Sequence, residues 1–165
     1  MSKILYYGGQ KSGKSRLSQQ KALELSNSSK PYYIATYNSN YNDNEMINRI
    51  SKHKIERENK FITIEETQNL AKHINSGKTY LIDCISMWIL NSIDKTEHEL
   101  IRDIEKLSKI DANIIFVLNN LNEGIIPIDK ESRKFIDLTG IIGQKLASIC
   151  DEVYEVKLGL TQRLK

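Results

Sequence analysis

The stretch GGQKSGKS, from Gly8 to Ser15, decides the fold of this chain of 165 residues. It follows a short apolar run, Ile4 to Tyr7, and leads into a segment that is predicted to be helical from Ser12 to Leu25. The spacing matches G-x-x-x-x-G-K-[ST]. A glycine-rich loop between a buried strand and a helix turns its backbone N–H groups inward, so that they surround an anion. The pattern therefore predicts a site for the phosphates of a nucleoside triphosphate.

The chemistry of phosphate binding explains each residue type in this loop. Glycine lets the backbone approach a phosphate closely and adopts positive φ angles. Lys14 is expected to reach the β- and γ-phosphates, and the Ser15 hydroxyl is expected to bind Mg²⁺. The alternative is a glycine turn that only caps a helix. All residues of the loop are candidates for nucleotide contact: Gly8, Gly9, Gln10, Lys11, Ser12, Gly13, Lys14 and Ser15.

Strand and helix patterns alternate along the rest of the chain. Strands are predicted at residues 4–7, 31–36, 61–66, 77–85, 113–120 and 152–160, the last with a hairpin. Helices are predicted at residues 12–25, 44–57, 67–75, 97–108 and 132–149. This alternation favours an α/β fold, with a mostly parallel sheet covered by helices on both faces. With neither repeat nor linker in view, we expect one P-loop NTPase domain over residues 1–165.

Composition narrows the class of protein further. A formal charge of +3, with lysines scattered among acidic residues, does not favour a nucleic-acid partner. Cys84 and Cys150 are far apart and form no metal-binding motif, so we expect two buried free thiols. The N-terminal apolar run is too short for a secretion signal, and no stretch has the length of a membrane span. These features predict a cytoplasmic protein.

A second metal ligand is expected at the end of a buried strand. Asp83 follows three apolar residues in YLIDC, as a Walker B acid does. Its alternative role is to cap the helix that follows, and both roles are compatible. A GTPase switch is disfavoured, because FVLNNLNEG carries neither the Lys nor the Asp of the guanine-reading N-K-x-D motif.

A set of ordered segments resembles the adenosylcobinamide kinase / adenosylcobinamide-phosphate guanylyltransferase family. The segments are GGQKSGKSR, YYIAT, DNEMINRISKHKIER, LIDCISMWILN, EGIIP and GQKLASICDEVYEV. The resemblance covers essentially the whole chain. It implies that a nucleoside triphosphate, ATP or GTP, phosphorylates adenosylcobinamide, and that GTP then donates GMP through an enzyme histidine to the new phosphate. It also implies a RecA-like fold, Mg²⁺, a corrinoid substrate and a trimer.

The family's guanylylated histidine falls in the segment carried here by RISKHKIER, which makes His53 the candidate. A neutral imidazole is a competent nucleophile near pH 7. His53 also lies on the apolar stripe of its predicted helix with Met46 and Ile50, so a core histidine is the alternative. Some relatives carry two adjacent histidines at this point, and the first of that pair is Lys52 here.

Charged residues surround His53 in the same predicted helix. Arg49 and Arg57 lie four residues to either side, where they could contact phosphate oxygens or simply face solvent. Asp43 and Glu45 match the family's acidic pair, which would steer a metal ion or favour a helix N-terminus.

The chain departs from the family at places that bear on the second substrate. Where relatives read N-E-V-G, this chain has Asn119-Asn120-Leu121-Asn122, and two arginines of a later segment are replaced by Ile136 and Ile141. These changes leave open two other functions. One is a P-loop kinase with another small-molecule acceptor, and the other is a non-catalytic nucleotide-binding protein.

Overall fold

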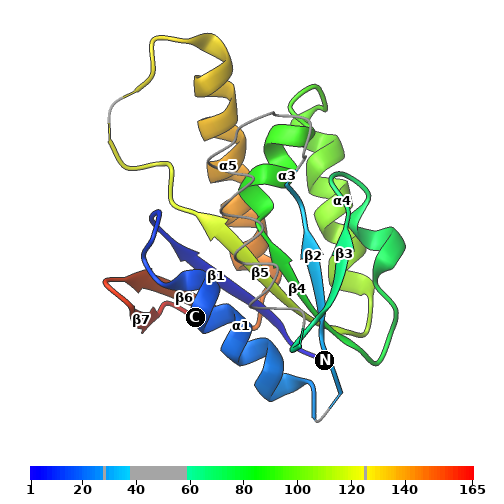
Figure 1. The fold of residues 1–165 in the computed structure, drawn as a ribbon. Coiled ribbons are helices and arrows are strands. Elements are labelled where there is room, and N and C mark those ends of the chain that lie inside the picture. The colour runs from blue at the N-terminus through cyan, green and yellow to red at the C-terminus, as the bar shows by residue number, and fades with distance from the viewer. Residues whose placement is uncertain (28, 38–58, 125) are drawn as a thin grey trace.

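The computed structural model describes residues 1–27, 29–37, 59–124 and 126–165 (Figure 1). The helix expected at residues 44–57 lies outside this part of the chain. The described strands are β1 (Lys3–Gly8), β2 (Tyr32–Ala35), β3 (Ile62–Glu65), β4 (Thr79–Asp83), β5 (Asn113–Asn119), β6 (Glu152–Lys157) and β7 (Leu160–Arg163). The described α-helices are α1 (Lys14–Leu25), α3 (Ile85–Asn91), α4 (Glu97–Lys109) and α5 (Lys130–Ile149).

All seven described strands form one sheet in the order β3-β2-β4-β5-β1-β6-β7. Every neighbouring pair is parallel except β6 and β7, which form the antiparallel hairpin predicted at the end of the chain. The register pairs Gly8 with Asn119 on one side and with Val156 on the other. The carboxyl ends of β1, β4 and β5 therefore meet at one edge, with β5 between the glycine-loop strand and the strand of Asp83. The expected α/β fold of the P-loop NTPase class is confirmed.

Both faces of the sheet are buried, which explains the continuous apolar runs in its strands. On one face, Ile4, Tyr6 and Leu81 pack in a cluster with Ala22 and Leu17 of α1. On the other face, a larger cluster contains residues of α3, α4 and α5; its members include Leu5, Ile82, Trp88, Phe116, Ile104 and Ile142. Figure 1 shows this division, with α1 alone on one face and α4 and α5 on the other.

The helix predicted at residues 67–75 is wrong, because only a 3-10 turn, η2 (Leu70–His73), forms there. The Glu66 carboxylate accepts hydrogen bonds from the N–H groups of Gln68 and Asn69, both at 2.9 Å, as a helix cap would. Trp88 Nε1, however, donates to the carbonyl of Gln68 at 2.8 Å, and the N–H of Lys72 bonds to the carbonyl of Asn69 instead. The Trp88 contact therefore takes the acceptor that an α-helical hydrogen bond from Lys72 would use.

Three other expectations can be compared with the structure. α5 begins at Lys130 instead of Ser132, because the Asp129 carboxylate accepts a hydrogen bond from the N–H of Ser132 and caps the helix. Cys84 and Cys150 are free, as predicted; Cys150 is buried and Cys84 is partly buried. Among the described helices, none has the length and apolar character needed to cross a membrane.

Candidate functional site

The glycine loop connects the end of β1 to the start of α1, as the sequence predicted. Gly13 is the N-cap residue of α1 and has a φ of 99°, a left-handed conformation that glycine adopts without steric cost. Gly8 has no room for a side chain, since a Cβ atom there would lie 2.4 Å from the carbonyl oxygen of Val156. Two of the motif glycines are therefore required by backbone geometry and close packing.

The loop is tied to the sheet on both sides of β1. The N–H of Asn120, at the end of β5, donates to the carbonyl of Gly8 at 2.9 Å. On the other side, the N–H of Gly159 in the β6–β7 turn donates to the carbonyl of Ser12 at 2.8 Å. Within the loop, the N–H of Ser12 donates to the carbonyl of Gly9 at 3.2 Å. These contacts hold the loop in a defined shape, so it is preorganised for a ligand.

The loop gathers positive charge in a confined place. Lys14 is only 7% exposed, and its Nζ donates to the carbonyl of Gly9 at 2.9 Å. The N-cap residue of α1, Gly13, has no side chain that could cap the helix, and a helix N-terminus of this kind favours an anion. The Ser12 hydroxyl is buried and has no hydrogen-bond partner among the described residues. A buried unpaired hydroxyl calls for an explanation, and an oxygen-rich ligand in the loop supplies one.

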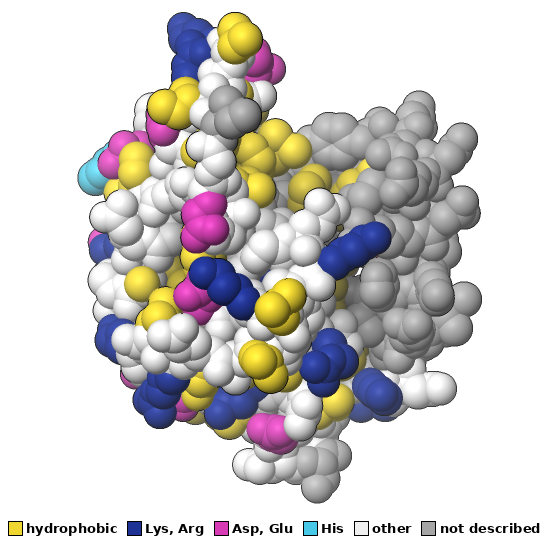
Figure 2. Space-filling model, turned by 90° about the vertical axis from the view of Figure 1, so that its left-hand side faces the viewer, with side chains coloured by type: hydrophobic (Ala, Val, Ile, Leu, Met, Phe, Trp, Pro, Cys, Tyr) yellow, Lys and Arg dark blue, Asp and Glu magenta, His cyan; other side chains and the backbone are white. Residues whose placement is uncertain are grey.

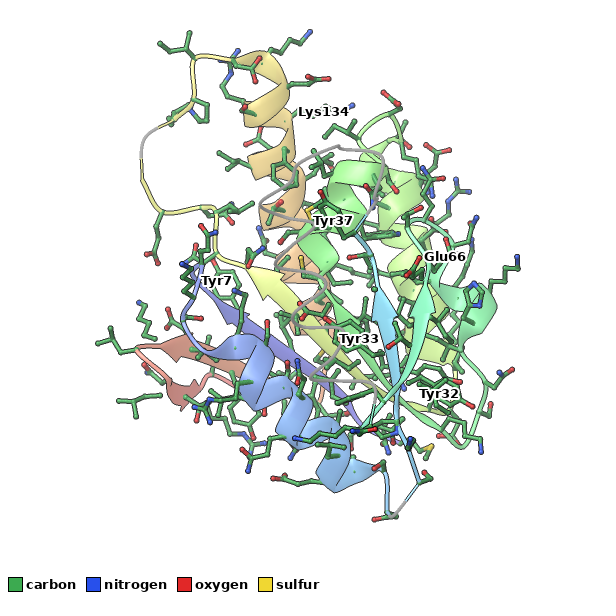
Figure 3. All side chains as sticks on the ribbon, viewed as in Figure 1. Tyr7, Tyr32, Tyr33, Tyr37, Glu66 and Lys134 are labelled. Carbon is green, nitrogen blue, oxygen red and sulfur yellow. The ribbon has the colours of Figure 1, made fainter. Side chains whose placement is uncertain are left out.

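Asp83 ends β4 at the same edge of the sheet. Its Oδ2 accepts a hydrogen bond from the hydroxyl of Tyr33 at 2.8 Å, which orients the carboxylate. Tyr33, labelled in Figure 3, belongs to β2, the strand beside β4. The N-cap residue of α3 is Cys84, with no side-chain cap. Asp83 therefore does not cap the helix that follows, and that alternative is wrong.

Contacts around Cys84 fix the end of β4. The Thr36 hydroxyl accepts from the N–H of Cys84 at 2.9 Å and donates to its carbonyl at 2.8 Å. Burial raises the pKa of the Cys84 thiol to about 12; the negative charge of Asp83 adds to this rise and the positive charge of Lys14 opposes it. In the sheet, β5 alone separates β4 from β1, so the end of β4 and the glycine loop lie at the same carboxyl edge. A thiol with this pKa is not a nucleophile at neutral pH.

The oxygen ligands at this edge of the sheet suit a magnesium ion whose other ligands are water and substrate phosphates. Ser15 offers a hydroxyl and Asp83 a carboxylate, and both residues are partly exposed. In the ranges that the structure describes, no group of three or more His, Cys, Asp or Glu side chains could hold a metal ion by itself. Mg²⁺ is commonly bound by one or two protein oxygens together with water and substrate phosphates. The donor set therefore fits Mg²⁺ bound with a nucleotide.

Several predicted site residues lie outside the described residues: Glu45, Arg49, His53 and Arg57, together with Asp43 and Lys52. The other two histidines are described. His73 Nε2 lies 2.9 Å from the Glu66 carboxylate, in the segment after β3, and His98 is exposed on α4. His73 is thus engaged in a contact that supports its own loop.

Two of the residues that depart from the family pattern, Asn122 and Ile136, meet at a second location. A cavity of about 140 Å³ lies between residues 121–124, 126 and 127 and α5, and Asn122 and Ile136 line it. Asn122 Nδ2 donates to the carbonyl of Ile136 at 3.3 Å. Asn122 Nδ2 also packs closely against Gly140: a Cβ atom added to Gly140 would lie only 2.8 Å from it. Ile141 follows Gly140 on α5 and is partly buried.

Sequence reasoning missed the roles of Tyr33 and Thr36. Both lie in the predicted strand YYIAT, and both are buried. Polar side chains at the carboxyl end of a buried strand could have indicated these roles, because a buried hydroxyl needs a hydrogen-bond partner. The partner itself could not be named from the sequence, since Asp83 lies 50 residues further along the chain.

Comparison with known proteins agrees with this geometry. A family model described as "cobinamide kinase / cobinamide phosphate guanyltransferase" matches residues 4–164. The bifunctional adenosylcobalamin biosynthesis protein CobP of Pseudomonas aeruginosa is 32% identical, over 98% of this chain and 96% of that protein. The CobU proteins of Escherichia coli and Salmonella typhimurium, which carry the same description, are 31% and 30% identical, over 98% of this chain and 99% of each relative. The chain therefore belongs to the cobinamide kinase / cobinamide phosphate guanyltransferase family, whose members are transferases.

Proposed function

We propose that the protein phosphorylates the hydroxyl of adenosylcobinamide with a nucleoside triphosphate and then transfers GMP from GTP to the resulting phosphate. Both reactions belong to cobalamin biosynthesis. The observation that carries the proposal is the preorganised glycine loop, which is tied to β5 and to the β6–β7 turn and holds a buried lysine. Family membership over residues 4–164 supports the choice of acceptor.

In the phosphoryl transfer, the loop binds and orients the phosphates. Backbone N–H groups of the loop surround the phosphate chain, and Lys14 exchanges its contact with the Gly9 carbonyl for the β- and γ-phosphate oxygens. The corrinoid hydroxyl attacks the γ-phosphorus, the nucleoside diphosphate leaves, and the hydroxyl proton passes to solvent. Positioning and electrostatic stabilisation dominate such a reaction, so no covalent enzyme intermediate is required.

Mg²⁺ would be held by the Ser15 hydroxyl and the Asp83 carboxylate. When bound, it neutralises charge on the phosphate oxygens. The Tyr33 hydroxyl keeps the Asp83 carboxylate oriented toward this task through its 2.8 Å hydrogen bond.

In the guanylyl transfer, His53 is the proposed nucleophile. Its neutral imidazole nitrogen attacks the α-phosphorus of GTP and pyrophosphate leaves. A phosphate oxygen of adenosylcobinamide phosphate then attacks the same phosphorus, which releases the imidazole and forms adenosylcobinamide-GDP. Arg49 and Arg57 are proposed to contact the phosphates, and Glu45 is proposed to steer the metal ion. We also propose that the protein acts in the cytoplasm as a trimer, in line with its family.

One observation favours a second function, a P-loop kinase with another small-molecule acceptor. Asn122 and Ile136, which depart from the family pattern, line the same cavity, and two family arginines are absent from α5. The loss of two cations removes contacts that an anionic corrinoid phosphate would use. The two functions differ in whether adenosylcobinamide is turned over.

Labelling with GTP tests the proposed function. The protein is incubated with α-³²P-GTP, and the label is then exposed to acid and to base. A histidine adduct is labile in acid and stable in base, and we expect such a label on the natural chain. The His53→Ala variant should lose the label and keep the phosphorylation of adenosylcobinamide, whereas His98→Ala, a change at an exposed histidine, should keep both. Undiminished label on His53→Ala would reject His53, and absence of adenosylcobinamide turnover would favour the second function.

A further inference from the structure

The turn of the β6–β7 hairpin has an unusual leucine. Leu158 has a φ of 54° and is 95% exposed, and Leu160 after the turn is 72% exposed. Glycine and asparagine adopt this left-handed conformation far more readily than leucine does. Exposure of the side chain to water is unfavourable as well. Both the left-handed backbone of Leu158 and the exposure of its side chain are therefore unfavourable, and no packing contact with the described residues offsets them.

This turn lies directly beside the glycine loop. The N–H of Gly159 donates to the carbonyl of Ser12 at 2.8 Å, and a Cβ on Gly13 would lie 3.2 Å from the Cα of Gly159. Strand β6 pairs with β1 up to the partners Val156 and Gly8. The position of the turn relative to the loop is therefore fixed by backbone contacts and not by flexible side chains.

The strand order indicates how a bound nucleotide would be oriented in the site. β5 and β4, which carry Asn119 and Asp83 at their carboxyl ends, lie on one side of β1, and the β6–β7 hairpin lies on the other. The end of the phosphate chain that reacts is expected beside Asp83. The nucleoside then extends toward the hairpin. Figure 1 shows the hairpin and the loop at the same side of the molecule, and Figure 2 views that side, where hydrophobic groups stand among lysine and arginine side chains.

We propose that the turn, residues 158–160, is the binding surface for the base and sugar of the nucleotide, with Leu158 packed against the flat face of the base. This inference rests on the proposed function, because it requires a nucleoside triphosphate in the glycine loop. Every nucleotide base has a flat face, so an apolar contact with that face does not select one base over another. Proteins that bind single-stranded nucleic acid without sequence preference use the flat face in the same way, by stacking bases on aromatic side chains. One surface of this kind serves both ATP and GTP, the two nucleotides that the proposed reactions use.

The experiment separates the phosphate part of binding from the nucleoside part. Calorimetric titrations with Mg²⁺ and without corrinoid use three ligands: inorganic tripolyphosphate and the α,β-methylene analogues of ATP and GTP. The Leu158→Asn variant suits the left-handed backbone, so it should fold. We expect it to bind both analogues about 5- to 10-fold more weakly, the loss expected for one apolar contact, and to bind tripolyphosphate unchanged. Leu158→Trp should restore the affinity, because its ring also stacks on a base.

The control is Leu164→Asn, which changes another exposed leucine, 56% exposed, beyond the end of β7. It should bind all three ligands as the natural chain does. If Leu158→Asn leaves the analogues unaffected, or weakens tripolyphosphate equally, the inference is overturned while the proposed function stands. A change of mass in sedimentation for Leu158→Asn would show a subunit contact and also overturn it. If neither the analogues nor tripolyphosphate bind the natural chain, the proposed function fails instead.

Discussion

The two ends of the candidate site are built in different ways. The nucleotide end, which comprises residues 8–15, Asp83 and the hairpin turn, is shaped mainly by backbone hydrogen bonds and glycine packing. The proposed acceptor end comprises residues 120–124, 126 and 127 and the first turns of α5, and its α5 part extends beyond the carboxyl edge of the sheet (Figure 1). Ile126 is 79% exposed there, and Asn122 and Ile136 depart from the family pattern. A site made from backbone tolerates sequence change around it, whereas a site made from side chains changes with each substitution.

The largest effect is expected at the nucleotide end, from Lys14→Met. This change removes the buried charge from the loop, and we expect turnover with any acceptor to fall by at least about 100-fold, as for loss of a group that stabilises the transition state. The rate of nucleoside diphosphate release measures it. The control is Lys11→Asn, which removes the exposed lysine of the same loop at a φ of 56° that asparagine accepts. Equal losses in both variants would contradict the role of Lys14.

The next largest effect tests whether packing shapes the nucleotide end. In Gly8→Ala, the new Cβ would lie 2.4 Å from the carbonyl oxygen of Val156 and 2.9 Å from the Ser12 hydroxyl. We expect the free energy of unfolding to fall by about 2 kcal/mol or more, because backbone must move. Gly9→Ala is the matched control, since no described residue other than its chain neighbours has an atom within 4 Å of its Cβ position. Urea denaturation measures both, and a similar loss in the two variants would refute the packing argument.

Tyr33→Phe tests the support of Asp83 with a smaller change. It removes the hydroxyl that donates to Asp83 Oδ2 at 2.8 Å and keeps the ring in contact with the core. Loss of a contact that orients a metal ligand weakens metal binding by about 10-fold or more. We expect the Mg²⁺ concentration for half-maximal turnover to rise by about that factor, with the rate at saturating Mg²⁺ largely retained. An unchanged Mg²⁺ dependence would mean that the hydroxyl does not act on the metal site.

A charge added to the acceptor end should affect only the second substrate. Ile136→Arg places a cation on the cavity lined by Asn122 and Ile136. We expect a roughly 3-fold lower KM for adenosylcobinamide phosphate, and no change for the nucleotide, because partly exposed ion pairs contribute modestly. Ile62→Arg adds the same charge on the edge strand β3, at a side chain that is 43% exposed, and should have no effect. Equal effects from both variants would show general electrostatic attraction.

A change in the free energy of unfolding provides a baseline from a region outside both ends. Burial alone would raise the pKa of Glu66, but the N–H groups of Gln68 and Asn69 and the contact with His73 outweigh it and lower that pKa below its ordinary value of 4.5. A lowered carboxyl pKa stabilises the fold above pH 4.5, and this stabilisation is lost as the pH falls through the lower folded-state value. Glu66→Gln should therefore cost about 1 kcal/mol at pH 7 and less at pH 3. Urea denaturation at the two pH values measures the difference, and a cost that does not depend on pH would contradict the ionic contribution.

Sequence patterns predicted the local structure of residues 3–25 well, because these patterns report local geometry. The strand, the glycine turn and the helix of residues 3–25 are contiguous, and their structure depends on neighbours in the chain. Prediction failed at residues 67–75, where Trp88, which is distant in the sequence, holds the backbone of Gln68. The role of Asp83 as a helix cap was wrong for a similar reason, since its carboxylate is engaged by Tyr33.

By itself, the sequence determined the glycine loop, the alternation of strands and helices and the resemblance to a family, because these depend on residue spacing and steric limits within short segments. The tertiary structure alone decided the neighbours of the loop. It placed Asn120 and Gly159 in hydrogen-bond contact with the loop from opposite sides, although they lie far along the chain from Gly8. Such pairings follow from strand order and from the burial of both faces of the sheet, which are properties of the whole fold.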